Sequence, residues 1–260
     1  MSVAGRTRLV HLSDLHFGAT DPAMHAPLAA AVRDLSPDLI VVSGDLTQRA
    51  RAVQFAQARV FLHSLGAPVL AVPGNHDMPL HRPLTRLLCP FRAWDRGWSP
   101  EREPAWQNDR VIVVGMNTAD PFAWRRGVIR RGQLNRLGTR LASAGNRIKV
   151  VVMHHPLEHL PGEDQPLMRG ASQALATLPG LGAQVVLSGH LHVSHIAPFA
   201  TAPGLLSLQA GTALSHRRRS EANAFNVLDL VPGGITAQIW RADAKGHFGP
   251  AAPGQDFALG

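Results

Sequence analysis

The 260-residue chain contains one cysteine, Cys89, and no tyrosine. A single cysteine excludes an internal disulfide and a zinc site built from several thiolates. No apolar run reaches the roughly 18 residues that a membrane-spanning helix needs. The segment from Met1 to Val10 also lacks the long apolar core of a signal peptide. These absences predict a reduced, soluble, cytoplasmic protein without a membrane span.

Lysine is almost as scarce as cysteine, since it occurs only at Lys149 and Lys245. Arginine therefore supplies nearly all of the 26 basic side chains, which outnumber 18 acidic ones and give a formal charge of +8. Such a charge can attract phosphate-bearing ligands, from nucleotides to nucleic acid. It is also what a GC-rich coding sequence produces, because the chain is rich in Ala, Gly and Pro as well. The charge alone therefore does not identify a partner.

Strand-like apolar runs alternate with helical patterns through the first three quarters of the chain. The expected strands are Arg8–Leu12, Asp38–Ser43, Val69–Val72, Arg110–Val114, Ile148–Met153 and Gln184–Ser188. The expected helices are Pro22–Leu35, Ala50–Leu65, Arg130–Ser143 and Ala171–Leu178. After residue 188 only short strands are expected, at His195–Phe199, Leu205–Gln209, Ala224–Val231 and Ile235–Arg241. This order predicts an α/β protein in which two sheets pack together with helices outside.

No linker of low complexity divides the chain, so a single domain over residues 1–241 is expected. Residues 89–108 fit neither the helical nor the strand period and are expected to form an ordered surface loop or a cap. Their tryptophans, Trp94, Trp98 and Trp106, are expected to pack this segment onto the core rather than to stack a nucleobase. Residues 242–260 are expected to be a loosely held C-terminal tail.

Polar residues collect where the predicted strands end. The segments are Ser13-Asp14-Leu15-His16, Ser43-Gly44-Asp45, Gly74-Asn75-His76-Asp77, His154-His155-Pro156 and Gly189-His190-Leu191-His192. Ligands of open α/β sheets bind at the carboxyl ends of the strands, so these side chains are expected to meet. The glycines of these turns permit sharp backbone angles and close approach.

Together the segments offer two carboxylates, one amide oxygen and four imidazoles: Asp14, Asp45, Asn75, His16, His154, His190 and His192. Seven nitrogen and oxygen ligands exceed what one tetrahedral zinc ion takes, but they suit two metal ions that share a bridge. Several imidazoles favour Mn²⁺, Fe or Zn²⁺ over Mg²⁺. Two ions about 3.5–4 Å apart can activate a bridging hydroxide and neutralise the oxygens of a phosphoryl group. The pattern therefore predicts hydrolysis of a phosphate ester.

This ordered series resembles the calcineurin-like metallophosphoesterase superfamily, and within it the bacterial class III cyclic-nucleotide phosphodiesterases. The resemblance implies a four-layer αββα sandwich with two central mixed β-sheets between helices. It also implies a ligand assignment. The first metal would take Asp14, His16, Asp45 and His192; the second would share Asp45 and add Asn75, His154 and His190.

The resemblance assigns further roles beside the metals. His76 would contact the phosphate and protonate or stabilise the leaving oxygen, with Asp77 orienting its ring. An imidazole suits this role because it titrates near neutrality. His155 is expected to pack or hydrogen-bond behind the ligands. Histidines outside the motifs, such as His11, are expected to be structural.

The leading hypothesis is therefore a binuclear-metal-dependent phosphodiesterase acting on small phosphodiesters, with cyclic nucleotides such as cAMP as first candidates. A nuclease, a phosphomonoesterase and a non-catalytic metal-binding scaffold are the alternatives. Ser215–Arg219 is either a phosphate clamp or a solvated basic turn. Lipid-precursor pyrophosphohydrolases are disfavoured, because they carry Arg in place of His76 and because no membrane-binding apolar patch is evident. The resemblance also implies a homodimer formed through the late strands.

Overall fold

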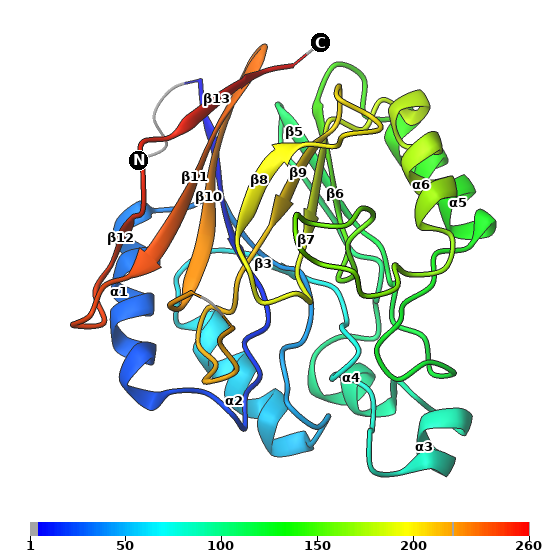
Figure 1. Ribbon diagram of the computed structural model, residues 1–260, viewed down its shortest axis with the longest axis vertical. Coiled ribbons are helices and arrows are strands. Elements are labelled where there is room, and N and C mark those ends of the chain that lie inside the picture. The colour runs from blue at the N-terminus through cyan, green and yellow to red at the C-terminus, as the bar shows by residue number, and fades with distance from the viewer. Residues whose placement is uncertain (1–4, 220, 260) are drawn as a thin grey trace.

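Two β-sheets lie at the centre of the computed structural model, which describes residues 5–219 and 221–259 (Figure 1). The first sheet has the strand order β12-β11-β10-β1-β2-β3, and β13 pairs with β11 beside β12. Its strands are β1 (Thr7–Leu12), β2 (Leu39–Val42), β3 (Val69–Ala71), β10 (Ala224–Val231), β11 (Gly234–Ala242), β12 (Phe248–Pro250) and β13 (Gln255–Ala258). β1, β2 and β3 are parallel, whereas β10 runs antiparallel to β1. The sheet is therefore mixed, as expected.

The second sheet has the order β4-β5-β6-β7-β9-β8. Its strands are β4 (Ala105–Gln107), β5 (Val111–Gly115), β6 (Ile148–Val152), β7 (Val185–Ser188), β8 (His195–Pro198) and β9 (Leu206–Gln209). The four inner strands are parallel and the two edge strands pair antiparallel to their neighbours. The parallel inner strands explain why β5 to β7 read as continuous apolar runs, since both of their faces are covered.

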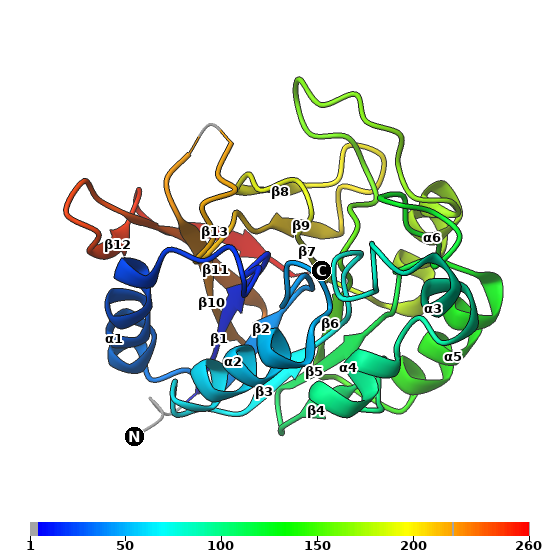
Figure 2. The ribbon, with the colours of Figure 1, turned by 90° about the horizontal axis from the view of Figure 1, so that it is seen from below.

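Helices cover the outer face of each sheet, and Figure 2 shows them on opposite sides of the sheet pair. The first sheet carries α1 (His25–Leu35), which follows a 3-10 turn at Pro22–Met24, and α2 (Ala52–His63). The second carries α5 (Arg131–Ala142) and α6 (Ala171–Thr177), followed by a 3-10 turn at Pro179–Leu181. The predicted four-layer αββα sandwich is thus confirmed.

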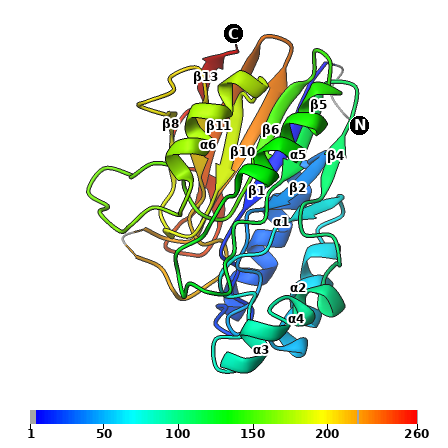
Figure 3. The ribbon, with the colours of Figure 1, turned by 90° about the vertical axis from the view of Figure 1, so that its right-hand side faces the viewer.

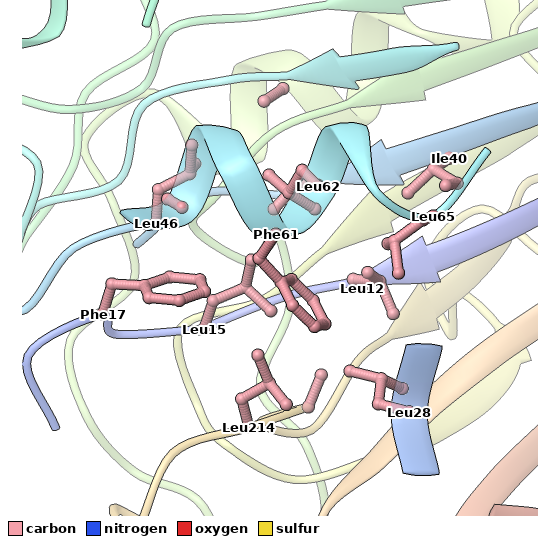
Figure 4. Packing of buried hydrophobic residues seen from close by; sticks show 14 of the residues in the cluster. Leu12, Leu15, Phe17, Leu28, Ile40, Leu46, Phe61, Leu62, Leu65 and Leu214 are labelled. Atoms are coloured by element: carbon pink, nitrogen blue, oxygen red, sulfur yellow. The ribbon is translucent and has the colours of Figure 1, made fainter. Parts of the chain in front are cut away.

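Side-chain alternation along β2 shows how the layers form. Leu39 and Val41 point into the cluster between the sheets, whereas Ile40 and Val42 point into the cluster under the helices. In Figure 4, Ile40 lies beside Leu65, which follows α2, and both belong to this second cluster. Burial of each large aliphatic side chain contributes about 2 kcal/mol, so the alternation fixes the register of the sheet.

Residues 89–108 are not simply a loop, because they contain α4 (Arg92–Gly97) and β4. The short helix α3 (Pro83–Leu88), also absent from the sequence-based prediction, precedes them. Trp94 is fully buried and packs edge-on against Phe55 of α2, with ring centroids 6.0 Å apart. The expected packing role of this tryptophan is therefore confirmed. Helices of six residues are too short to display a period, which is why the sequence does not reveal them.

The prediction of a loose tail at residues 242–260 is wrong for most of that segment. Ala242 pairs with Phe248 of β12, and Gly234 pairs with Ala258 of β13. The proposed boundary at residue 241 therefore falls inside β11. β13 is mostly exposed, so its sequence lacks the apolar alternation that predicts a strand. Within the described part of the chain, no helix is long and apolar enough to cross a membrane.

Candidate metal centre

Five of the seven predicted ligands lie on strand-end loops with left-handed backbone. The φ angles are 51° at Asp14, 50° at His16, 54° at Asp45, 78° at His190 and 58° at His192. Among the described residues only Ser36 and Ala50 are other non-glycine residues with positive φ. Such backbone costs about 1–3 kcal/mol per residue and clusters at functional sites, where the surrounding structure maintains it.

One group of side chains joins the ends of β1, β2 and β7. Asp14 Oδ1 lies 3.1 Å from His192 Nε2 and 3.6 Å from His16 Nε2. His16 Nε2 also lies 3.8 Å from Asp45 Oδ2 and 3.1 Å from His192 Nε2. The four residues expected around a first metal are therefore brought together.

A second group shares Asp45 and continues toward the loops after β3 and β6. His154 Nε2 lies 3.5 Å from Asp45 Oδ2 and 3.1 Å from Asn75 Oδ1. His190 Nδ1 lies 3.1 Å from the same Asn75 oxygen and 3.3 Å from His154 Nε2. All seven predicted ligands thus meet in two adjoining groups, with Asp45 between them.

The chemistry of these groups fits cations. Asp14 Oδ1 is buried and accepts no hydrogen bond among the described residues, a state that is costly without a positive partner. Burial lowers the pKa of His16 to about 4 and that of His190 to about 3, so both imidazoles are neutral near pH 7. Neutral imidazole nitrogens and carboxylate oxygens converging on one point are ligands for divalent metal ions.

Backbone carbonyls determine which ring nitrogen faces the centre. His154 Nδ1 donates to the carbonyl oxygen of Ser43 at 2.8 Å, and His192 Nδ1 donates to that of Arg217 at 2.6 Å. Because a carbonyl can only accept, both Nδ1 atoms carry a proton, and in the neutral ring each Nε2 lone pair points into the site. Metal-ligating histidines are usually oriented in this way. Burial lowers the pKa of His192, but Asp14 beside the ring outweighs it and raises that pKa, so His192 is the more readily protonated of the two.

A buried chain of hydrogen bonds positions Asp14. Asn226 Nδ2 lies 3.3 Å from His11 Nδ1, His11 Nε2 lies 2.8 Å from Ser43 Oγ, and Ser43 Oγ donates to Ser13 Oγ at 2.9 Å. Ser13 Oγ in turn donates to Asp14 Oδ2 at 2.6 Å. These hydrogen bonds occupy Oδ2 of Asp14 and leave its Oδ1 facing the ligand group. His11 is a structural histidine, as expected, and it supports the site from behind.

Glycine is required at two of the turns. A Cβ at Gly189 would lie 1.8 Å from Ser13 Oγ and 2.6 Å from Asp14 Oδ2. Gly44 has a φ of 100°, and a Cβ there would lie 2.6 Å from His154 Nδ1. Both positions confirm the predicted need for close backbone approach.

His76 lies beside the first group, but Asp77 does not orient it. His76 Nδ1 lies 3.0 Å from the carbonyl oxygen of Gln48. The carboxylate of Asp77 instead accepts hydrogen bonds from the backbone N–H groups of Gly74, Leu46 and Thr47 at 2.9–3.1 Å. The expectation that Asp77 orients the imidazole is therefore corrected. Asp77 holds the Asp45 loop against the Asn75 loop, and Gln48, which sequence reasoning missed, fixes the ring.

Arg217 resolves the alternatives for the basic segment Ser215–Arg219. Its Nη1 lies 2.9 Å from His76 Nε2 and 3.5 Å from His16 Nε2, so this guanidinium faces the ligand group. Arg219 instead pairs with Glu163 at the surface, at 2.5 Å. One arginine of the segment thus points into the site. No signal in the sequence distinguishes it from its neighbours.

His155 lies close to His154 and His190, with ring centroids 4.8 and 4.7 Å away. Both of its nitrogens already have partners: Nδ1 lies 2.9 Å from Thr118 Oγ1, and Nε2 lies 2.8 Å from the carbonyl oxygen of Arg125. Burial lowers the pKa of His155 well below its ordinary range, which keeps it neutral. His155 thus packs behind the predicted ligands His154 and His190, as expected.

Comparison with solved structures finds the same fold in two phosphatases. A dimetal phosphatase of Danio rerio has a TM-score of 0.70 at 12% identity, and the match covers 98% of this chain and 99% of that one. Purple acid phosphatase PPD1 of yellow lupin has a TM-score of 0.74 at 12% identity, with 99% of this chain matched and 54% of that one. At such identities the likeness concerns the fold alone.

Curated relatives are more similar in sequence. A protein named "Probable cyclic nucleotide phosphodiesterase" from Synechococcus sp. is 28% identical over 203 residues, which are 72% of this chain and 74% of that protein. Glycerophosphodiester phosphodiesterase GpdQ of Enterobacter lignolyticus is 29% identical over 163 residues, 57% of this chain and 56% of that protein. The chain thus spans little more than half of the length of GpdQ.

A family model for calcineurin-like phosphoesterases matches residues 7–194, a segment that contains all seven predicted ligands. Within this segment, three groups of His and Asp side chains that share members could each hold a metal ion: Asp14 with His16 and His192, His16 with Asp45 and His76, and Asp14 with Asp45 and His154. The chain belongs to the calcineurin-like phosphoesterase family and is a metal-dependent phosphoric ester hydrolase.

Proposed function

We propose that this protein is a binuclear-metal phosphodiesterase that hydrolyses small phosphodiesters. The observation that carries the proposal is the pair of ligand groups sharing Asp45, with His76 and Arg217 at their edge. Metals alone suit many hydrolytic reactions. A neutral imidazole and a guanidinium placed together beside them suit the phosphoryl group and leaving oxygen of an ester.

The donor set supports Mn²⁺, Fe or Zn²⁺ as the ions. Asp14, His16, Asp45 and His192 would hold one, and Asp45, Asn75, His154 and His190 would hold the other. Such ions, when bound, supply Lewis-acid stabilisation of the phosphoryl oxygens and lower the pKa of a water nucleophile. The four imidazoles argue against Mg²⁺, which prefers oxygen ligands.

His76 has a defined tautomer, which sets what it can do. Its Nδ1–H donates to the Gln48 carbonyl, so Nε2 accepts from Arg217 Nη1. Burial lowers the pKa of His76 to about 2, so this nitrogen is unprotonated at neutral pH. An anionic phosphate beside the ring raises the pKa of His76 and draws the Arg217 fork toward its oxygens. We propose that His76 then takes up a proton from solvent at Nε2 and donates it to the leaving oxygen, while Arg217 binds the phosphoryl group.

Cyclic nucleotides such as cAMP are the first candidate substrates, because several curated relatives carry that activity in their names. One is the 3',5'-cyclic adenosine monophosphate phosphodiesterase of Escherichia coli, 28% identical over 166 residues, 60% of this chain and 54% of that protein. Glycerophosphodiesters are the second candidates, supported by the similarity to GpdQ.

A metal-reconstituted substrate panel tests the proposal. The panel contains bis-p-nitrophenyl phosphate, cAMP, a glycerophosphodiester, p-nitrophenyl phosphate and single-stranded DNA, each assayed with Mn²⁺, Fe²⁺ and Zn²⁺. The expected result is turnover of the small diesters that disappears on chelation. His76→Gln is expected to lower kcat by about 100-fold while the metal content stays unchanged. Preference for DNA or for the monoester, or turnover that survives chelation, contradicts the proposal.

A further inference from the structure

Exposed apolar side chains gather on α3 and on the loop at residues 120–124. They form a patch of five side chains, which we call the α3 tip: Leu84, Leu87, Leu88, Phe122 and Trp124. Their exposed fractions are 74%, 50%, 82%, 74% and 63%. Figures 1 and 3 both place α3 at the lower extremity of the molecule. The expectation that the chain lacks such an apolar patch is therefore wrong. The sequence does not reveal the patch, because its two parts are separated along the chain.

The two parts of the α3 tip are held together by a buried arginine. Arg86 is only 4% exposed, and its guanidinium donates to the backbone carbonyls of Asp120, Pro121 and Ala123. It also lies over the ring of Trp124, 5.4 Å from the centroid. The fold thus fixes α3 against this loop while their apolar side chains face outward. A contiguous exposed apolar patch of this kind marks an interaction surface.

A basic cavity of about 910 Å³ adjoins the α3 tip, between α2 and the α3–α4 segment. Thr85 of α3 lines it, together with six arginines: Arg49, Arg51, Arg59, Arg82, Arg92 and Arg96. No Asp or Glu belongs to the lining. The salt bridges among the described residues use other arginines, so none of these six has a carboxylate partner. The charge of this cavity is therefore complementary to that of an anionic ligand.

We propose that the α3 tip and this cavity together form a docking surface for an anionic phospholipid bilayer. Leucines and aromatic rings insert at the boundary between head groups and acyl chains, and arginines bind the head-group phosphates. The charge argues against a second copy of this chain as occupant, because two arginine-lined faces repel each other. A soluble nucleotide would leave the exposed α3 tip unexplained, and the cavity lining contains no Phe, Trp or Tyr to stack a base.

Vesicle sedimentation tests the proposal with the metal-loaded full chain. The probes are vesicles of phosphatidylglycerol mixed with phosphatidylcholine, and vesicles of phosphatidylcholine alone. We expect binding to the mixed vesicles, little binding to the neutral ones, and weakening as the salt concentration rises above about 0.1 M. Equal binding to both kinds of vesicle, or binding to neither, overturns the proposal.

Paired variants separate the two parts of the surface. The double variant Leu84→Ser with Leu88→Ser is expected to weaken vesicle binding by more than about 10-fold. Its matched control is Val60→Ser with Val231→Ser, which removes exposed apolar side chains elsewhere and is expected to leave vesicle binding unchanged. Arg92→Gln with Arg96→Gln is expected to weaken it by about 20-fold. The matched control, Arg110→Gln with Arg131→Gln, removes the same charge from other exposed sites and retains most of the binding. Hydrolysis of bis-p-nitrophenyl phosphate by each variant reports that it is folded.

Two further measurements distinguish the other occupants. The first measures the binding of tripolyphosphate. If tripolyphosphate binds as tightly as the vesicles, and if Leu84→Ser with Leu88→Ser binds tripolyphosphate and vesicles as wild type does, the cavity is a site for soluble polyanions and the proposal is wrong. If light scattering shows a dimer that the leucine variants abolish, the α3 tip is a contact between copies of the chain, which also overturns it.

Discussion

The two ligand groups that share Asp45 are held in different ways. In the first, Asp14, His16 and His192 all have left-handed backbone, and neither Asp14 Oδ1 nor His16 Nδ1 has a hydrogen-bond partner among the described residues. In the second, Asn75 and His154 have ordinary φ angles, and Ser43 anchors the His154 ring. The first group is therefore the more strained and the less completely paired of the two, although His190 of the second group also has left-handed backbone.

Charge separates the groups as well. The first contains the Asp14 carboxylate in addition to the shared Asp45, whereas the second adds only the neutral side chains Asn75, His154 and His190. A divalent ion therefore gains more electrostatic stabilisation in the first group. In the proposed binuclear centre the two metal positions are therefore not equivalent, and we expect the second position to release its ion first.

The largest effect is expected at the residue that the groups have in common. Asp45→Asn removes the shared negative charge, so both positions lose affinity and kcat for bis-p-nitrophenyl phosphate falls by about 1,000-fold, or about 4 kcal/mol of barrier. Metal analysis of the purified variant checks that both ions are affected. Retention of one ion at full occupancy would show that the two groups are independent.

Single substitutions in each of the two groups test whether their metal affinities differ. Asn75→Ala is expected to empty the second position while the first stays filled, and Asp14→Asn is expected to weaken both, because the field of Asp14 also reaches His154. Activity should fall by about 100-fold or more in each case. Titration with a chelator, followed by metal content, should show two steps in wild type and one in Asn75→Ala. A single step in wild type would contradict the inequality.

Asp77 links the Asp45 loop to the Asn75 loop, so its substitution tests how the second group is held. In Asp77→Asn, an amide nitrogen replaces one of the oxygens that now accept backbone N–H groups of Leu46, Thr47 and Gly74. The loss is expected to cost about 2–3 kcal/mol of unfolding free energy, measured by urea denaturation. A proton-transfer role for Asp77 would instead move the pH profile of kcat while leaving stability unchanged.

Acidification tests the buried chain behind the first group. Burial lowers the pKa of His11 from 6.5 to about 3, so the unfolded chain binds a proton in this interval that the folded protein does not. This contribution to stability is complete above pH 6.5 and is lost as the pH falls, by about 2 kcal/mol at pH 5. Urea denaturation of metal-free protein should show a shallower pH dependence for His11→Gln than for wild type. Identical slopes would exclude His11 as the source.

Much of the fold and the centre could be predicted from sequence because both depend on short-range patterns. Continuous apolar runs at β2 and β6 identify buried parallel strands. These strands belong to different sheets, and their carboxyl ends meet where the sheets pack together, which brings Asp45 and His154 within 3.5 Å. The partners of His76 could not be predicted. Gln48 and Arg217 come from loops distant in the chain, and only their tertiary placement selects them over other residues of the same type. β13 could not be predicted for a similar reason, because only its pairing with β11 identifies this segment as a strand.

The left-handed backbone of the ligand loops has a consequence for how this protein tolerates mutation. At His16 or His192, glycine adopts the observed φ without the cost of about 1 kcal/mol that a side chain incurs. A glycine at either position would relieve this strain, but it would also remove a buried imidazole that we propose as a metal ligand. The cavity left behind would cost more than the strain relieved. The packing of these rings is therefore what keeps the left-handed backbone of the loops in place, so a variant that truncates a ring tests backbone geometry and metal binding together.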